Sequence, residues 1–144
     1  MVAIGSDHGG FGLKQEIMAH LEAAGVPYQD LGTYSEDSCD YPDIAKAVCT
    51  AVLEGVCEKG ILICGTGIGI SMSANKIRGI RAALCTDSFM AKYTRLHNDA
   101  NVLCMGGRVL GPGLACEITD TFLTTGFEGG RHAVRVQKMM DLEK

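Results

Sequence analysis

A cysteine stands directly before a glycine-rich stretch, in the segment Cys64-Gly65-Thr66-Gly67-Ile68-Gly69. Glycines leave backbone N–H groups uncovered, and the N-terminus of a following helix would add the positive end of its dipole. We therefore expect this stretch to bind an anion and to favour the thiolate form of Cys64, which could then act as a nucleophile or as a general base. The structural alternative is a tight strand-to-helix turn whose glycines serve only steric needs.

Basic side chains form a second group of candidates. Arg131 and Arg135 are four residues apart, so on a helix their guanidinium groups would lie on one face, roughly 6 Å apart, and could hold one phosphate. Arg108 follows a glycine pair and could also bind an anion. For these arginines the alternative is a solvated surface, which for the helical pair includes an ion pair with Glu128.

Histidine offers acid–base chemistry near neutral pH, and His97 stands near the predicted end of a helix. A cation is stabilised there by the helix dipole, so capping is the alternative to a catalytic role. The four histidines are scattered along the sequence with no acidic cluster beside them. We therefore expect no metal site.

The composition narrows the class of protein. The 144 residues carry a formal net charge of −4, which argues against nucleic acid as the main partner. No apolar run approaches the ~20 residues that span a bilayer and no signal segment is present, so we expect a cytoplasmic protein with no membrane partner. The seven cysteines include no C-x-x-C pair, which excludes zinc ribbons and thioredoxin-type sites, and their odd number fits free, mostly inert thiols.

Apolar runs alternate with helical patterns along the whole chain. Strands are expected at the apolar runs around residues 2–4, 26–31, 60–64, 80–85 and 101–105. Helices are expected to end at Gly25, Gly55, about Lys76, His97, before Gly126 and at about Leu142. This order predicts one α/β domain over residues 1–144, with a five-stranded parallel sheet covered by helices on both faces and the run 60–64 at its centre.

Ligands of open parallel sheets bind beyond the carboxyl ends of the strands, where the strand order reverses. The residues expected at these ends are Asp7 and His8 after the first strand, the Cys64 loop after the third, and Arg108 after the last. The sequence therefore predicts a site at this edge of the sheet.

Several motifs together carry a family resemblance. They are Ser6-Asp7-His8-Gly9-Gly10-Phe11, Asp40-Tyr41-Pro42-Asp43, Ile63-Cys64-Gly65-Thr66-Gly67-Ile68-Gly69-Ile70-Ser71, Ser73-Ala74-Asn75-Lys76, His97-Asn98-Asp99-Ala100-Asn101 and Gly129-Gly130-Arg131-His132. In order and spacing they resemble the ribose-5-phosphate isomerase B family, which also includes allose- and galactose-6-phosphate isomerases. The resemblance implies a Rossmann-like three-layer α/β/α sandwich and a homodimer, or a dimer of dimers, with the active site at the subunit interface. The helix at about 131–142 is expected to take part in dimerisation.

The resemblance also implies a role for each candidate. Cys64 would be the base that moves a proton between C2 and C1 of an open-chain sugar phosphate, and His97 would open the furanose ring. Asp7 would contact the sugar hydroxyls, and Thr66 would stabilise the enediolate together with the loop amides. The remaining substrate-binding residues are the loop positions Gly65, Gly67, Ile68 and Gly69, then Asn98, and finally the phosphate ligands His8, Arg108, Arg131 and Arg135. No metal or organic cofactor is implied.

In the implied homodimer, His97, Asn98 and Arg108 are expected to reach the pocket whose Cys64 belongs to the other subunit. The first functional hypothesis is an aldose–ketose isomerase of ribose 5-phosphate and ribulose 5-phosphate, in the pentose phosphate pathway. One alternative prefers a six-carbon aldose, namely allose, allose 6-phosphate or galactose 6-phosphate. Another is a non-catalytic phosphate- or nucleotide-binding module of flavodoxin-like fold, which would leave the cysteine, aspartate and histidine motifs without a common purpose.

Overall fold

A five-stranded parallel sheet in the order β2-β1-β3-β5-β4 forms the centre of the structure, a computed structural model that describes residues 1–143. The strands are β1 (Val2–Ser6), β2 (Tyr28–Asp30), β3 (Lys59–Cys64), β4 (Ala82–Leu84) and β5 (Val102–Gly106). The central place predicted for residues 60–64 is confirmed. The edge strands β2 and β4 are shorter than the apolar runs that predicted them, because each pairs with a neighbour on one side only.

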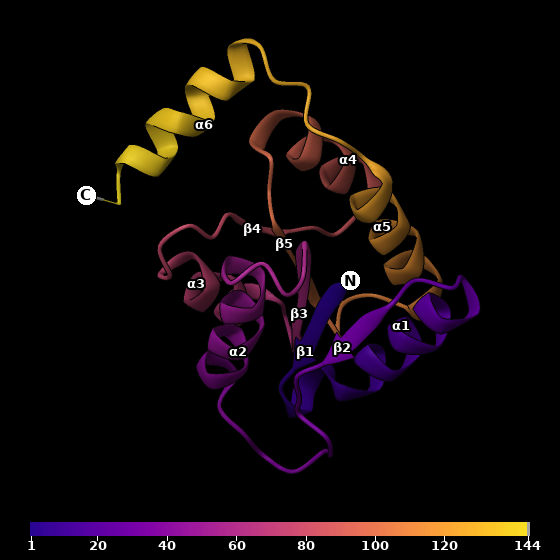
Figure 1. The fold of residues 1–144 in the computed structure, drawn as a ribbon. Coiled ribbons are helices and arrows are strands. Elements are labelled where there is room, and N and C mark those ends of the chain that lie inside the picture. Colours follow the sequence, from indigo (N-terminus) through magenta and orange to yellow (C-terminus); the bar gives the residue numbers. More distant parts are fainter. Residues whose placement is uncertain (144) are drawn as a thin grey trace.

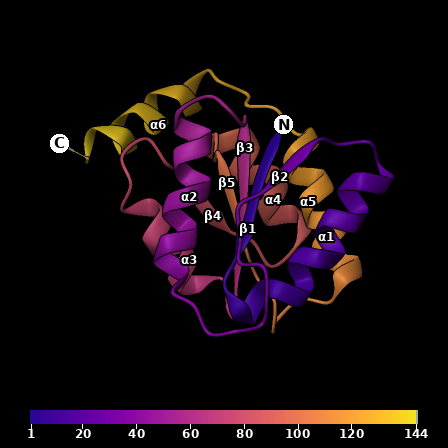
Figure 2. The same cartoon turned by 60° about the horizontal axis from the view of Figure 1, so that its bottom comes forward.

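Helices cover both faces of this sheet, as Figures 1 and 2 show from two directions. A short 3-10 turn, η1 (His8–Gly10), leads into the first helix, and the helices are α1 (Phe11–Ala23), α2 (Tyr41–Leu53), α3 (Ile68–Asn75), α4 (Ser88–Asn98), α5 (Pro112–Thr124) and α6 (Arg131–Asp141). α1, α4 and α5 lie on one face, and α2 and α3 lie on the other. The predicted three-layer α/β/α architecture is therefore confirmed.

The side chains of β3 alternate between two apolar cores, as the two-residue period of a strand requires. Ile61 and Ile63 pack with α1, α4 and α5, while Leu62 and Cys64 pack with α2 and α3. Burial on both faces explains why this strand is an unbroken apolar run in the sequence. It also anchors Cys64 firmly where the strand ends.

Lys14 differs from what the sequence pattern predicts. The pattern places it on another face of α1 than the apolar stripe of that helix, yet its side chain is fully buried. The ammonium nitrogen lies 2.6 Å from Oδ1 of Asp30 and also donates to the backbone oxygen of Thr33. A buried cation needs such partners, and here they fix the loop that follows β2.

α6 stands apart from the three layers and projects beyond the sheet, with α4 as its main neighbour. Its apolar residues Val134 and Met139 are exposed, as is Leu142 just after it. Exposed apolar side chains grouped on a projecting element are typical of an interaction surface. Among residues 1–143, no helix has the length and apolar character needed to cross a membrane.

Candidate active site

The strand order reverses between β1 and β3, because the chain runs from β1 outward to β2 and continues on the other side with β3. The crevice beyond the carboxyl ends of these two strands is the standard ligand site of open α/β sheets. Asp7 directly follows β1, and Cys64 is the last residue of β3. The prediction that these two residues lie at the same edge of the sheet is confirmed.

Three loops meet at this edge. The backbone N–H of Gly107 donates to the carbonyl oxygen of Cys64 at 2.8 Å, and that of Arg108 donates to Gly65 at 3.0 Å. A methyl group on Gly107 would lie 2.7 Å from the carbonyl oxygen of Gly9, so the loops after β1 and β5 also touch. The absence of side chains here brings the backbone of all three loops close to any bound ligand.

The sulfur of Cys64 is aimed at the glycine loop. Only 5% of the residue is exposed, and Sγ accepts a hydrogen bond from the N–H of Gly67 at 3.2 Å. Gly67 has a φ of +80° as the N-cap of α3, and a methyl group there would lie 2.5 Å from Cδ1 of Leu84. Only glycine fits this conformation and space, and it directs an N–H group at the sulfur. Such a donor stabilises negative charge on a thiolate.

Other buried cysteines have a different environment. Burial raises the pKa of Cys49 to about 12, and burial together with Asp87 raises the pKa of Cys85 to about 12. Burial also raises the pKa of Cys104, well above its ordinary value. These thiols stay protonated and serve as small apolar core groups, as predicted, and all seven cysteines of the chain are free.

Asp7 and His8 are oriented by backbone groups. Oδ1 of Asp7 accepts from the N–H of Gly10 at 3.2 Å, which fixes the carboxylate of a residue that is only 6% exposed. Nδ1 of His8 lies 3.2 Å from the N–H of Cys39 and accepts its hydrogen bond. Because Nδ1 is the acceptor, the proton of the neutral ring is on Nε2. His8 therefore presents an N–H donor, which suits a phosphate oxygen.

Tyr41 lies over the first turn of α3 and was given no role from the sequence. A methyl group on Gly69 would lie 2.8 Å from Cζ of the tyrosine ring and 3.1 Å from its hydroxyl oxygen. The ring therefore covers the helix N-terminus next to the Cys64 loop. The motif Asp40-Tyr41-Pro42-Asp43 was the signal that could have identified it.

A second cluster forms where α4 ends and α6 begins. A cavity of about 330 Å³ is lined by four of the predicted site residues, His97, Asn98, Arg131 and Arg135, and by His132. The predicted i, i+4 arginine pair thus lies beside the predicted ring-opening histidine. An anionic ligand in this cavity could therefore accept hydrogen bonds from the two arginines and from His97.

The rings of His97 and His132 stack, with centroids 4.1 Å apart and planes inclined by 11°. Nε2 of His97 lies 3.6 Å from Oε1 of Glu128, so Glu128 pairs with this histidine and not with the arginines. Burial of its ring, then the neighbouring His97 and Arg131, lower the pKa of His132. His132 is thereby kept neutral near pH 7.

His97 and His132 are far apart in the sequence and have no acidic cluster beside them there, but folding brings the two together with Glu128. His97, Glu128 and His132 bring three potential metal-ligand atoms within 4.8 Å of one another. However, the lone pairs of ring nitrogens lie in the ring plane, and the planes of these two stacked rings are nearly parallel, so both cannot point at one ion. The cluster in this arrangement is a poor metal site, and the absence of a metal stays a prediction.

The two clusters lie at opposite ends of the sheet. The N–H of Gly60, near the start of β3, donates to the carbonyl oxygen of Asn101 just after α4, whereas Cys64 ends the same strand. Four residues of strand span roughly 13 Å, and His97 lies in the last turn of α4, four residues before Asn101. Arg108 lies beside Gly65 of its own chain. The expectation that it accompanies His97 is therefore wrong, because its loop follows β5 at the carboxyl edge.

Comparison with known proteins identifies the family. The sequence profile described as Ribose/Galactose Isomerase matches residues 2–139. The chain belongs to this family. The ribose-5-phosphate isomerase B of Escherichia coli is 50% identical over 143 residues, which cover 99% of this chain and 96% of that protein.

Solved structures agree with this membership. The ribose-5-phosphate isomerase B of Clostridium thermocellum superposes with a TM-score of 0.97 at 54% identity, covering 99% of this chain and 96% of that one. The enzyme of Thermotoga maritima gives a TM-score of 0.96 at 50% identity, with 97% of each chain covered. The chain is thus a ribose/galactose isomerase by sequence and by fold, and the resemblance in its motifs is confirmed. Membership in an isomerase family excludes the non-catalytic binding module.

Proposed function

We propose that this ribose/galactose isomerase interconverts ribose 5-phosphate and ribulose 5-phosphate by moving a proton between C1 and C2 through an enediolate. The observation that carries the proposal is the position of the Cys64 sulfur. Cys64 is the last residue of the central strand, and its sulfur accepts a hydrogen bond from the N–H of Gly67 in a crevice lined by glycines. The names of relatives at 50% and 54% identity support the choice of a five-carbon substrate.

In this mechanism the thiolate of Cys64 takes the proton from C2 of the open-chain aldose and returns it to C1. The negative oxygen that develops would be stabilised by the loop N–H groups and by the hydroxyl of Thr66. Oγ1 of Thr66 already accepts from the N–H of Ile68 at 3.2 Å, so its own proton remains available to donate to the substrate. The carboxylate of Asp7 would accept a hydrogen bond from a sugar hydroxyl.

Each complete site would draw on two chains. The Cys64 cluster and the His97 cluster lie at opposite ends of the sheet within one chain, so one small sugar phosphate cannot contact both. A homodimer with two-fold symmetry would place the His97 cluster of one chain over the Cys64 crevice of the other, twice. The projecting α6, with its exposed Val134 and Met139, supports such an arrangement.

His97 would open the ring by transferring protons at the ring oxygen. Replacing His97 with alanine should lower the interconversion rate by roughly 10²–10⁴-fold. It should leave a ring-independent step intact: exchange of the C1 hydrogen of ribulose 5-phosphate in heavy water, followed by NMR. This ketose is acyclic because its O5 carries the phosphate. The variant His20→Ala, which removes a surface partner of Asp120, serves as the control. Equal losses in both reactions would show that His97 has another role.

Arg131 and Arg135 would hold the phosphate. Charge-assisted hydrogen bonds contribute roughly 1.5–3 kcal/mol each, so replacing both arginines by alanine should lower kcat/KM for ribose 5-phosphate by about 10²–10⁴-fold. Inhibition by inorganic phosphate should weaken similarly, whereas turnover of free allose should change little. Lys138→Ala, an exposed cation on the same helix, is the matched control. A comparable loss with free allose would mean that the pair is structural.

A direct test of the proposed function compares kcat/KM for ribose 5-phosphate, allose 6-phosphate, galactose 6-phosphate and free allose on one preparation. We expect the highest value for ribose 5-phosphate. A higher value for a six-carbon sugar would replace the proposal by the alternative substrate class, and absence of turnover with all four would overturn it.

A further inference from the structure

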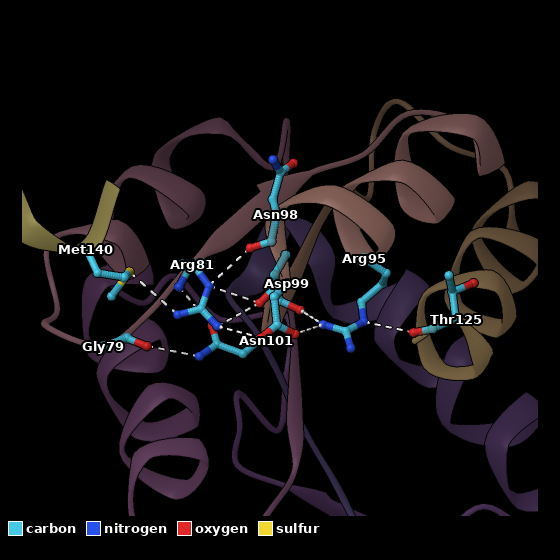
Figure 3. A network of polar contacts seen from close by, with 9 residues as sticks. Gly79, Arg81, Arg95, Asn98, Asp99, Asn101, Thr125 and Met140 are labelled. Atoms are coloured by element: carbon cyan, nitrogen blue, oxygen red, sulfur yellow. Dashed lines mark hydrogen bonds and ion pairs between the residues drawn. The ribbon is translucent and has the colours of Figure 1, made fainter. Parts of the chain in front are cut away.

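The end of α4 is held by a polar network that the proposed mechanism does not use (Figure 3). Asp99, the residue after this helix, has a φ of +48° and a ψ of 43°. This is the left-handed backbone conformation, which residues other than glycine rarely adopt. It directly follows His97 and Asn98. Residues in such conformations persist where the surroundings over-determine them, and they cluster at functional sites.

Arg81, from the turn that precedes β4, reaches this helix end from one side. Its Nε lies 3.2 Å from the carbonyl oxygen of Asn98 and 3.0 Å from that of Asp99, and its Nη2 lies 2.8 Å from the latter oxygen. These carbonyls lack partners within the helix. In Figure 3 the side chain of Asn98 points away from the network while its carbonyl group points toward Arg81.

Arg95 approaches Asp99 from the other side. Its Nη1 donates to Oδ1 of Asp99 at 2.9 Å, and its Nε donates to the carbonyl oxygen of Thr125 at 3.0 Å. Arg95 thereby joins the helix end to the segment that leads toward α6, and its side chain is only 8% exposed. It serves the fold itself, so its replacement would not separate positioning from folding.

Arg81 is itself held by Asn101 and also contacts α6. Oδ1 of Asn101 accepts from the backbone N–H of Arg81 at 2.8 Å, and Nδ2 of Asn101 donates to Gly79 at 2.9 Å. At its other end Nη1 of Arg81 lies 3.5 Å from Sδ of Met140 in α6. One guanidinium group therefore contacts both the helix that carries His97 and the helix that carries the arginine pair.

We propose that Arg81, acting with Asp99, is a positioning residue that sets the direction of His97 and Asn98 for ring opening. The inference rests on the proposed function, because the benefit of a fixed helix end is the placement of those two side chains over the partner's crevice. A misplacement of about 1 Å can cost about 10²-fold in rate, so a residue that touches no substrate can still control the reaction.

The test uses Arg81→Met, which keeps an unbranched apolar stem but removes the donors and the charge of the guanidinium group, and Arg81→Lys, which restores the charge without the planar fork. We expect Arg81→Met to lower kcat/KM for ribose 5-phosphate about 10- to 100-fold, while C1 hydrogen exchange of ribulose 5-phosphate stays close to wild type. Arg81→Lys should recover part of the loss. Arg78→Met, an exposed cation three residues earlier with no side-chain hydrogen bond among residues 1–143, should behave as wild type.

Equal losses in interconversion and in C1 exchange, or no loss in either, would overturn the inference. If Arg81→Met does not fold, Asp99→Asn gives the same comparison, because asparagine tolerates the left-handed conformation and removes only the charge that faces both arginines. The imidazole NMR signals of His97 give an independent readout and should shift in Arg81→Met but not in Arg78→Met. A wild-type protein that fails to interconvert the two sugars would overturn the proposed function, whereas unchanged His97 signals would overturn the positioning role.

Discussion

Replacing Cys64 by alanine is expected to lower the interconversion of ribose 5-phosphate and ribulose 5-phosphate by roughly 10²–10⁴-fold or more. The reason is that the proposed mechanism has one base for both proton transfers, and that base is the sulfur held beneath the N–H of Gly67. Binding should remain largely intact, because the phosphate ligands and the loop amides are unchanged. Calorimetric titration of the inactive variant with ribose 5-phosphate measures this directly.

Two further variants separate chemistry from packing. Cys64→Ser keeps a hydrogen-bond acceptor of similar size but replaces the thiol by a hydroxyl group that ionises far less readily, so it should be as inactive as the alanine variant. Cys49→Ala removes a fully buried thiol from the same apolar core and should lower stability by about 1 kcal/mol, with kcat unchanged. Near-normal kcat in Cys64→Ala would exclude the cysteine as the base.

The carboxyl-edge half of the site could be predicted from sequence because its residues directly follow strands. In a parallel sheet all strands end at one edge, so the places of Asp7, Cys64 and Arg108 in the chain suffice to bring them together. The apolar pattern also identifies β3 as central, because burial on both faces leaves no polar positions. Local patterns thus predicted both the fold and the location of the crevice.

Other features depend on contacts that spacing does not encode. His97 and His132 stack although 35 positions separate them in the numbering, since the loop after α5 returns across the end of α4. The sequence pattern places Lys14 away from the apolar stripe of α1, but in the fold Asp30 at the end of β2 pairs with its ammonium group. The separation of His97 from Cys64 likewise depends on the direction of α4, which returns the chain to the amino edge of the sheet. Contacts between residues so far apart in the sequence can be identified only from the three-dimensional structure.

The placement of Arg108 also decides how the two half-sites are composed. The family resemblance implies that it accompanies His97, whereas its place after the last strand predicts the carboxyl edge; the second expectation is confirmed, because its backbone N–H donates to Gly65 next to Cys64 of the same chain. The half-site at the carboxyl edge therefore contains the proposed base together with two proposed phosphate ligands, His8 and Arg108. The half-site at the amino edge contains the proposed ring-opening group together with the arginine pair of α6.

Mixing two inactive variants should then restore activity. Homodimers of Cys64→Ala and of His97→Ala each lack one group in every site, so both should be inactive. When subunits exchange at random, half of the dimers become heterodimers. Each heterodimer has one site with both defects and one site with neither, as two-fold symmetry requires. Half of the dimers, each with half of its sites intact, gives a recovery of roughly a quarter of wild-type activity.

The position of Arg108 supplies the matched control for this experiment. Cys64→Ala mixed with Arg108→Ala should recover nothing beyond the mean of the two parents, because both changes affect the same half-site and every site in the heterodimer keeps one defect. Native mass spectrometry must first confirm that subunits have exchanged in both mixtures. Recovery with His97→Ala but not with Arg108→Ala would establish that Cys64 and His97 act across the interface. No recovery in the His97→Ala mixture would place both groups in one chain and would exclude the shared site.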